Sequence, residues 1–321
     1  MSFRNLGETL GLNASTVYRK ITPFLNDLPY CADLSRGNDK HYCGILLLDG
    51  KYTHVKGYND KIPVIYGLDY LTHDIVHFIL SRGENYQTSM SFFQSLRLLG
   101  YPLKALVCDD NQNFQLACRN TYPKAIIQIC HNHYKENIRR QLFIRSDPTY
   151  RSFMVEIEKL FSRRMSSVEF FTLARKILLK YGSDPKCQGV LLDIEKRKDV
   201  LLAYMREKHI PRTTNLIECF NSHLEGRLKS IKGFESMPHA KSWFNAYFIR
   251  RRLKPFTDCR GQFRKLNGQC SLQIVIKDDS KYQALKKNSG DRFCNGTKTV
   301  GNSRLELLTP VLSGRCSNQL S

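Results

Sequence analysis

The feature that most constrains the fold is an alternation of apolar runs and helical periodicity between residues 44 and 130. Three runs rich in β-branched residues come first, and the last two are predicted to form a hairpin. The predicted order is strand (44–58), strand (62–70), strand (74–81), helix (86–100), strand (103–108), helix (111–123) and strand (124–130). This order is typical of a mixed α/β sheet with helices on its faces.

Two acidic residues are expected at the ends of predicted strands. Asp49 follows the run GILLL, and Asp109 follows LKALVC. If these strands are neighbours, the two carboxylates converge at one edge of the sheet. Asp49 could instead be a turn residue, because Asp-Gly is a common turn dipeptide. Asp110 is expected to cap the following helix, and Asp69 and Asp74 are expected to be turn residues of the hairpin.

A third carboxylate lies in the segment TTNLIECFNSHLEGRLK, at 213–229, which has helical periodicity. One face carries an apolar residue at every fourth position, namely Leu216, Phe220, Leu224 and Leu228. Glu218 lies on the opposite side, three residues after Asn215, which is the spacing of a capping box. The residues alone therefore leave a helix cap and a metal ligand as alternatives, and Glu225 is a rival ligand on the same polar face.

Three carboxylates without histidine or cysteine suit a hard divalent cation such as Mg²⁺ or Mn²⁺. Two such ions about 3.5–4 Å apart can activate an attacking water or 3′-hydroxyl and stabilise the leaving oxygen of a phosphodiester. If all three are ligands, Asp49, Asp109 and Glu218 would be catalytic residues that hold two such ions.

The charge of the chain indicates a polyanionic partner. Its formal net charge is +21 over 321 residues, which is typical of proteins that bind nucleic acid or an anionic membrane. The longest apolar runs are far shorter than the roughly 20 residues that span a bilayer, and the N-terminus has no signal-peptide core. We expect an intracellular, DNA-associated protein, in the cytoplasm and nucleoid of a prokaryote or the nucleus of a eukaryote, with no membrane partner. The eleven cysteines include no CxxC pair and are expected to be buried thiols.

Residues 3–26 resemble a helix-turn-helix, with Gly11 at the turn and Asn13 capping the second helix. Three leucines are expected to face inward: Leu6, Leu10 and Leu12. Five outward side chains suit phosphates and base edges: Ser15, Thr16, Tyr18, Arg19 and Lys20. An ordinary helical hairpin is the alternative. Because the motif starts almost at Met1, we expect residues 1–30 to form a partial DNA-binding segment.

The second half of the chain is mostly helical and basic. The stretch 134–210 is charged and helical, and another basic helix contains SWFNAYFIRRRLKPF, in which Trp243 is expected to pack in the core. DNA phosphates are the expected partners of Arg227, Lys229, Arg250, Arg251 and Arg252. A solvated basic face is the alternative. Residues 257–321 are rich in Gly, Ser, Asn and Lys and are expected to form a basic, mostly irregular tail.

Three blocks between about residues 44 and 250 resemble DDE transposases of the Mutator-like type, a group that includes related insertion-sequence enzymes. The first block is LLDGKY and the third is RTTNLIECFNSHLEGRLKSIKGF, which match the first and third acids of the family at Asp49 and Glu218. The second block, LVCDDNQNFQLACRNTYPKAIIQICHNHYKENI, aligns Asp109, Tyr122-Pro123, Cys130, His133 and Asn137 with the family pattern. Position 110 departs from this pattern, because many relatives have Gly there.

The resemblance implies an RNase H-like catalytic core over 44–133 and 211–256, interrupted by an all-helical insertion over 134–210. It implies two Mg²⁺ (or Mn²⁺) ions and favours Glu218 as a ligand. It also implies that Cys130 and His133 lie in the vicinity of the active site, where they would help to position DNA or the insertion. A zinc site would require two further ligands, and simple packing is the other alternative for this pair.

The predicted function is DNA transposition, in which the protein cleaves element ends and transfers the 3′-hydroxyl to target DNA. One alternative is a domesticated or degenerate copy that acts as a non-catalytic DNA-binding protein. A second alternative is an RNase H-type nuclease that cuts but does not join. The expected partners are the terminal repeats of the element, target DNA and further copies of the chain, because two ends must be brought together.

Overall fold

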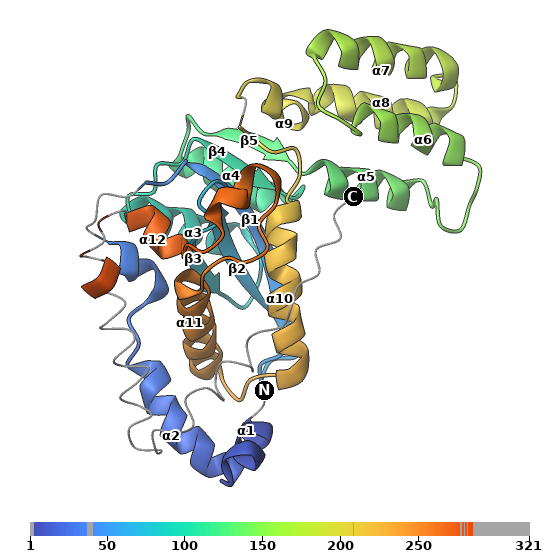
Figure 1. Cartoon of the computed structure of the whole chain (residues 1–321). Coiled ribbons are helices and arrows are strands. Elements are labelled where there is room, and N and C mark those ends of the chain that lie inside the picture. Colours follow the sequence, from blue (N-terminus) through green and yellow to red (C-terminus); the bar gives the residue numbers. More distant parts are fainter. Residues whose placement is uncertain are drawn as a thin grey trace.

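The computed structural model describes residues 3–36, 41–207, 209–276, 278, 280 and 282–284. Its centre is a five-stranded sheet of order β3-β2-β1-β4-β5 (Figure 1). The strands are β1 (Ile45–Thr53), β2 (Ile62–Asp69), β3 (Ile75–Leu80), β4 (Ala105–Cys108) and β5 (Ile126–Ile129). β1, β2 and β3 pair antiparallel, whereas β1, β4 and β5 pair parallel. This mixed sheet confirms the predicted RNase H-like α/β class.

All predicted strands and helices of this region are present, but β1 differs in one respect that affects the site. It runs to Thr53, within the predicted strand 44–58, so Asp49 lies in the middle of the strand. The expectations that Asp49 ends the strand or forms a turn are therefore wrong. Asp49 pairs with Tyr66 across the antiparallel ladder to β2. The long β1–β2 ladder keeps the strand extended past the point where the parallel pairing with β4 ends.

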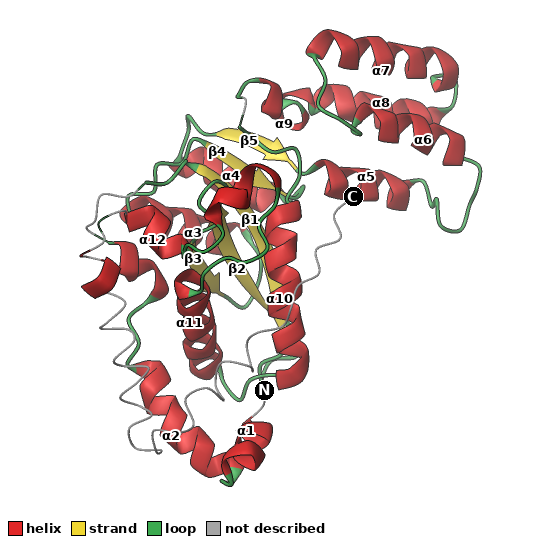
Figure 2. Cartoon of the chain, in the orientation of Figure 1, coloured by secondary structure: helices red, strands yellow, loops and turns green. Residues whose placement is uncertain are grey.

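Helices cover both faces of the sheet (Figure 2). On one face, α3 (Tyr86–Leu98) and α4 (Gln112–Thr121) pack through Phe92 and Phe114 against Leu46 and Leu48 of β1. On the other face, α10 (Asn215–Ile231) and α11 (Met237–Leu253) pack against Leu47. Because side chains alternate along a strand, Asp49 shares the face of Leu47 and is directed toward α10.

Between β5 and α10 the chain is helical. This region contains α5 (His131–Gln141), α6 (Arg151–Leu160), α7 (Ser167–Tyr181), α8 (Pro185–Lys196), α9 (Lys198–Leu201) and the 3₁₀ turn η2 (Ala203–Met205). Ser166 and Asp184 cap α7 and α8. Figure 1 shows α6, α7 and α8 beside one another and outside the sheet. The helices begin at His131, three residues earlier than the predicted start at 134.

The N-terminal helices α1 (Phe3–Leu10) and α2 (Ala14–Asn26) form the predicted hairpin. Gly11 adopts φ +66° at the turn, and Asn13 Oδ1 accepts a hydrogen bond from the Thr16 backbone N–H at 2.7 Å. Leu6 is buried, whereas Leu10 and Leu12 are half-buried. Helix α2 packs on α11, where Ser242 Oγ donates to Asn26 Oδ1 at 2.8 Å. The hairpin is followed by the 3₁₀ turn η1 (Cys31–Ser35).

In the described part of the segment after residue 257, the chain is more ordered than the expected irregular tail. It contains η3 (Gly261–Leu266) and α12 (Ser271–Ile276), which pack onto the core through Leu266 and Leu272. The part of the predicted tail beyond residue 284 lies outside the described residues. Every cysteine within the described ranges is a free thiol. In the same part of the chain, no helix combines the length and apolar character needed to span a bilayer.

Candidate active site

Asp49 and Asp109 come together where the parallel pairing of β1 with β4 ends, at the edge of the sheet formed by the C-terminal end of β4. The parallel β1–β4 register pairs Leu47 with Val107, so the two acids lie two positions further along adjacent strands and on the same face. Burial raises the pKa of Asp109 to about 6, and the charges of Asp49 and Glu84 add to this effect. Asp109 Oδ1 is buried and has no hydrogen-bond partner among the described residues. The pair is therefore close enough for mutual repulsion and has an oxygen available to a ligand.

Helix α10 holds Asp49 through Asn221. The Asn221 amide donates to Asp49 Oδ2 and accepts a hydrogen bond from the Tyr66 hydroxyl, which lies 2.8 Å from Asn221 Oδ1. The Gly50 N–H donates to the other carboxylate oxygen of Asp49 at 2.7 Å. The sequence interpretation missed Asn221. It could have been found as the one polar residue on the buried stripe that α10 presents to the sheet.

Glu218 lies in the first turn of α10, but it is not part of a capping box. The helix begins at Asn215, whose Oδ1 accepts a hydrogen bond from Asn132 Nδ2 at 2.8 Å. Glu218 Oε1 instead accepts a hydrogen bond from Thr214 Oγ1 at 2.9 Å and lies 3.8 Å from His133 Nε2. The carboxylate therefore faces the start of α5, and its charge contributes to raising the pKa of Asp49, after burial as the main cause.

Cys130 and His133 lie beside Glu218. Cys130 precedes the first turn of α5, His133 lies within that turn, and one potential ligand atom from each of the three residues lies within 4.8 Å of the others. Burial opposes ionisation of the Cys130 thiol, but interactions with His133 and Thr214 lower its pKa below the ordinary value. The same contact with Cys130 raises the pKa of His133 to about 9. At neutral pH these shifts favour an imidazolium at His133 in contact with the sulfur.

Glu84 is a fourth acid near this edge that the sequence did not reveal. Its Oε1 accepts a hydrogen bond from Asn111 Nδ2 at 2.8 Å, and Oε2 accepts one from the Tyr52 hydroxyl. Asn111 also caps α4, which begins at residue 112, one residue later than expected. The prediction that Asp110 caps this helix is therefore wrong, because Asp110 forms an ion pair with Arg197 after α8.

Glu225 is separate from this acid cluster. Its carboxylate forms ion pairs with Lys51 at 3.5 Å and Lys229 at 3.3 Å. The side chain is nearly half exposed. The rival ligand suggested by the helix pattern thus has two cationic partners of its own.

The predicted DNA-contacting residues of α2 lie at or near the surface. Arg19 and Lys20 are exposed, and Arg19 lies 3.5 Å from the Thr16 hydroxyl. Tyr18 is 38% exposed, and the edge of its ring contacts His239 of α11, with 5.7 Å between centroids. Part of the Tyr18 ring therefore joins the two helices.

The basic residues of α10 and α11 differ in their environment. Burial lowers the pKa of Arg250 to about 10, and the charge of Arg227 adds to this effect. The Arg251 guanidinium lies over the Phe220 ring, 4.5 Å from its centroid. The prediction that Arg252 contacts DNA is wrong, because its side chain is fully buried and forms an ion pair with Asp74 at 2.7 Å. Trp243 is half-buried and packs against the core, as predicted.

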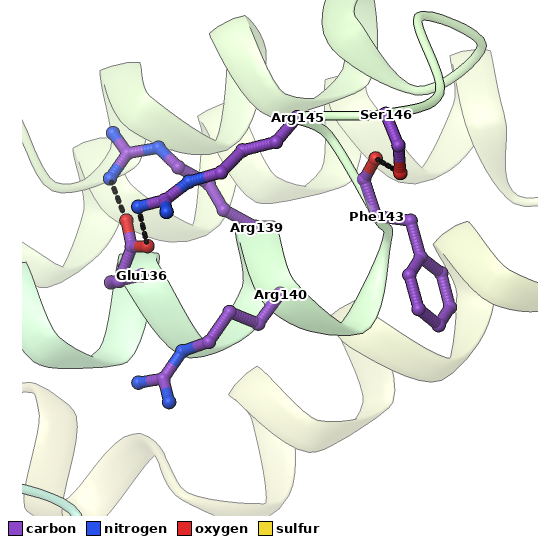
Figure 3. Close-up of a pocket in the computed structure, with 6 residues that line it drawn as sticks. All are labelled: Glu136, Arg139, Arg140, Phe143, Arg145 and Ser146. Atoms are coloured by element: carbon purple, nitrogen blue, oxygen red, sulfur yellow. Dashed lines mark hydrogen bonds and ion pairs between the residues drawn. The ribbon is translucent and has the colours of Figure 1, made fainter.

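A separate pocket lies at the C-terminal end of α5 (Figure 3). It is lined by Glu136, Arg139, Arg140, Phe143, Arg145 and Ser146. Glu136 forms ion pairs with Arg139 at 3.3 Å and with Arg145 at 2.9 Å. The acids of the sheet edge do not line this pocket, so it is distinct from the candidate active site.

Comparison with known proteins adds a family assignment. A family model described as "Transposase, Mutator family" matches residues 35–244. No curated protein matches the chain. The chain is similar to the HTLV-2 integrase catalytic core domain in complex with magnesium (dimeric form), with 17% identity, a TM-score of 0.23, and coverage of 41% of this chain and 92% of that chain.

A second similar structure is the simian T-cell lymphotropic virus intasome in complex with PP2A regulatory subunit B56 gamma. The identity is 15% and the TM-score 0.24, with coverage of 60% of this chain and 68% of that chain. At these TM-scores neither viral structure bears on the function of this chain.

Proposed function

Because the chain belongs to the Mutator family of transposases, we propose that it cleaves the ends of a DNA element and joins the freed 3′-hydroxyl to target DNA. Asp49, Asp109 and Glu218 are the catalytic acids. They are also the ligands of two Mg²⁺ or Mn²⁺ ions. A bound pair of such ions supplies Lewis-acid activation of the attacking oxygen and stabilises the leaving oxygen.

The observation that carries this proposal is the environment of Asp109. Its buried Oδ1 has no hydrogen-bond partner within the described ranges, and the charges of Asp49 and Glu84 surround it. A divalent cation would satisfy the buried oxygen and offset the repulsion. Carboxylate oxygens are the ligands that Mg²⁺ prefers, so the residues present fit the proposed ion.

The neighbouring side chains hold the acids in place. Asn221 fixes the orientation of Asp49 from α10, and Thr214 fixes that of Glu218. The Asn111–Glu84 hydrogen bond holds the loop that follows Asp109. Asp49 and Glu218 are thus held by direct hydrogen bonds and the loop after Asp109 by a neighbouring one, which limits the reorganisation needed when substrate binds.

Two basic surfaces are proposed to hold DNA. The first consists of Thr16, Tyr18, Arg19 and Lys20 on α2. The second consists of Arg227, Lys229, Arg250 and Arg251 on α10 and α11. These residues belong to α2, α10 and α11, and α2 packs directly on α11. Cationic side chains contact phosphates without reading sequence. We expect a dimer or larger assembly on DNA, because transposition requires two ends.

The test is a strand-transfer assay with the full chain. Protein is mixed with DNA from the flanks of its own coding region, a target plasmid, and Mg²⁺ or Mn²⁺. Wild type should give joined product, Asp109→Asn should give none while still binding the ends, and Glu225→Gln serves as an acid-to-amide control on the same helix as Glu218. Binding without cleavage in either metal would support a degenerate, non-catalytic copy. Cleavage without joining would support a nuclease.

A further inference from the structure

We propose that Cys130, His133 and Glu218 form a site for a thiophilic divalent cation of the Zn²⁺ type, and that occupation of this site inhibits the enzyme. Binding requires only these three side chains. The inhibitory effect rests on the proposed function, because it depends on Glu218 serving as a catalytic acid.

The three side chains come from different parts of the fold and meet at one point. Cys130 follows β5, His133 lies in the first turn of α5, and Glu218 lies in the first turn of α10. Their potential ligand atoms lie within 4.8 Å of one another, and His133 Nε2 is 3.8 Å from Glu218 Oε1. Ligands of one tetrahedral zinc ion are separated by roughly 3.4 Å, given bonds of about 2.1 Å. Small side-chain movements would therefore close the site.

Thr214 arranges two of the three donors. Its backbone N–H and hydroxyl lie 3.4 and 3.2 Å from Cys130 Sγ, and the hydroxyl lies 2.9 Å from Glu218 Oε1. A residue that contacts both the sulfur and the carboxylate fixes their separation before any ion arrives. Partners of this kind are typical of metal sites, where they orient the ligands.

The solvent exposure of the three side chains would allow an ion to bind reversibly. Cys130 is fully buried, whereas the side chains of His133 and Glu218 are 38% and 41% exposed. An ion can therefore enter from solvent and keep a water molecule as a fourth ligand. Three protein ligands with an open position are a common zinc arrangement.

The donor set distinguishes this site from the proposed Mg²⁺ site. Sulfur and imidazole favour Zn²⁺, whereas Mg²⁺ prefers oxygen ligands. Asp49 and Asp109 supply only oxygen, and Glu218 is the one residue common to both sites. A Zn²⁺ ion on Cys130 and His133 would therefore withdraw Glu218 from the catalytic acids.

The binding test uses Co²⁺ as a spectroscopic substitute for Zn²⁺. Metal-free, reduced full-length protein is titrated with Co²⁺, and absorption from sulfur-to-cobalt charge transfer and from tetrahedral cobalt is recorded. We expect the sulfur-to-cobalt band to saturate at one equivalent and Zn²⁺ to abolish it. Loss of an outer partner of a metal site typically costs about 10–100-fold in affinity, so loss of a ligand in Cys130→Ser or His133→Ala should cost at least about 100-fold.

Cys219→Ser is the matched control. Cys219 is adjacent to Glu218 and half-buried, but it is not part of the cluster, so this variant should keep the full charge-transfer band. The half-exposed His133 can be replaced with little risk to folding, and circular dichroism would verify both variants. Absence of the band in wild type would overturn the proposal, as would an equal band in Cys130→Ser.

The inhibition test compares strand transfer in Mg²⁺ with and without one equivalent of Zn²⁺, as a ratio within each variant. Wild type and Cys219→Ser should lose at least tenfold in activity, whereas the ratio for His133→Ala should stay near one. Equal inhibition of His133→Ala would show that Zn²⁺ acts elsewhere. If wild type shows no activity in Mg²⁺, the proposed function fails while the cobalt result still stands.

Discussion

Two pairs of carboxylates lie in the same sheet, and they differ in how their oxygens are satisfied. Asp69 and Asp74 lie at the β2–β3 turn and are fully buried. Asp49, within β1, and Asp109, directly after β4, form the second pair, called here the edge pair, and are half-buried. The more buried pair has many hydrogen-bond partners, whereas the less buried pair leaves an oxygen of Asp109 without one among the described residues.

In the turn pair, Asp69 and Asp74, the carboxylate oxygens accept hydrogen bonds from several donors. Asp69 Oδ2 accepts hydrogen bonds from the Tyr101 hydroxyl at 2.8 Å and from the Cys43 N–H at 3.1 Å. Asp74 accepts two hydrogen bonds from the Arg252 guanidinium, at 2.9 and 2.7 Å. Burial raises the pKa of Asp69, but the hydroxyls of Tyr101 and Thr72 oppose this shift. These acids are tolerated in the interior because their partners offset the cost of burial.

In the edge pair, Asp49 and Asp109, like charges lie close together and one carboxylate oxygen is not satisfied by the described residues. Asp109 lies near Asp49 and Glu84, and these charges disfavour its ionised form. Carboxylates placed close to one another, with raised pKa values, are typical of sites that bind a cation or a substrate. The comparison teaches that hydrogen-bond satisfaction, rather than depth of burial, separates structural acids from candidate catalytic acids in this protein.

The largest expected effect is on catalysis at Asp109. Asp109→Asn should lower cleavage at least about 10⁴-fold, or ~5 kcal/mol of transition-state stabilisation, because a metal ligand is lost. The free energy of unfolding should stay the same or rise, because a repelled charge is removed. Strand-transfer rates and urea denaturation of the same preparation measure both. A clear loss of stability would mean that Asp109 is structural, like the turn pair.

The next effect concerns Asp74. Asp74→Asn leaves the fully buried Arg252 without its counter-charge, which should lower the free energy of unfolding by about 3–5 kcal/mol. Urea denaturation followed by circular dichroism measures the change. Asp109→Asn is the matched control. Equal free energies of unfolding for the two variants would contradict the proposed difference between the turn pair and the edge pair.

A smaller effect is expected at Asn221, which joins the edge pair to α10. Asn221→Leu removes the 2.8 Å hydrogen bond of the buried Tyr66 hydroxyl and leaves it only the Ile217 carbonyl at 3.5 Å, at a cost of about 1–3 kcal/mol. It should also lower activity by about 10–100-fold, because Asp49 loses its hydrogen bond from α10. Denaturation and cleavage assays measure the two effects.

Tyr66→Phe provides the control for Asn221→Leu, because it removes the Tyr66–Asn221 hydrogen bond but keeps the contact of Asn221 with Asp49. It should affect stability more than cleavage. Similar loss of cleavage in both variants would argue against a positioning role for Asn221.

The pH dependence of stability should also differ between the pairs. The pKa of Asp109 is raised from 3.8 to about 6 in the folded protein, so between these values the folded state holds the proton more tightly. Its contribution to stability is present below pH 4 and is lost as pH rises through 6.

Relative to Asp109→Asn, wild type should therefore lose roughly 1–2 kcal/mol between pH 4 and 7, since one pKa unit corresponds to ~1.4 kcal/mol and solvent screens part of it. Denaturant titrations at both pH values measure this difference. Mg²⁺ at pH 7 should restore part of it by binding the folded state. A constant difference from pH 4 to 7 would contradict the expectation.

The smallest effect is expected at Glu225, whose ion pairs are exposed. Glu225→Gln should change the free energy of unfolding by less than about 1 kcal/mol, and strand transfer should be unaffected. A large loss of activity would return Glu225 to the set of candidate ligands and would weaken the case for Glu218.

Much of the fold was predictable because its signals are local. The apolar runs and helical periods between 44 and 130 predict every strand and helix of that region, and Asn13 and Gly11 predict the N-terminal turn. The convergence of Asp49 and Asp109 followed from placing β1 beside β4. The extent of β1 falls within the predicted strand 44–58, but the position of Asp49 was misjudged, because the segment GILLLDG suggests a strand that ends and does not show the pairing with β2 that carries β1 past Asp49.

Errors arose where a distant partner decides the outcome. Arg252 lies in a basic run that suggests exposure, but its counter-ion Asp74 is 178 positions away. Asp110 is a residue type that often caps helices, but it forms an ion pair with Arg197, and Asn111 is the N-cap residue of α4. Asn221 and Glu84 were missed because each acts on an element outside its own segment. The local sequence pattern around a residue does not show which distant residue it will contact.

The ion pair of Asp74 and Arg252 has a consequence for the order in which the chain can fold. Arg252 also donates to the carbonyl of Cys31, 221 positions away, and Ser271 donates to Asp74 across 197 positions. Contacts of such sequence separation form slowly, because long loops must close first. During synthesis, residues up to Arg252 must leave the ribosome before the Asp74 charge is neutralised, and residues up to Ser271 before its hydrogen bonds are complete. A nascent chain released early therefore carries an unsatisfied charge within its sheet and cannot complete the fold from its N-terminal part alone.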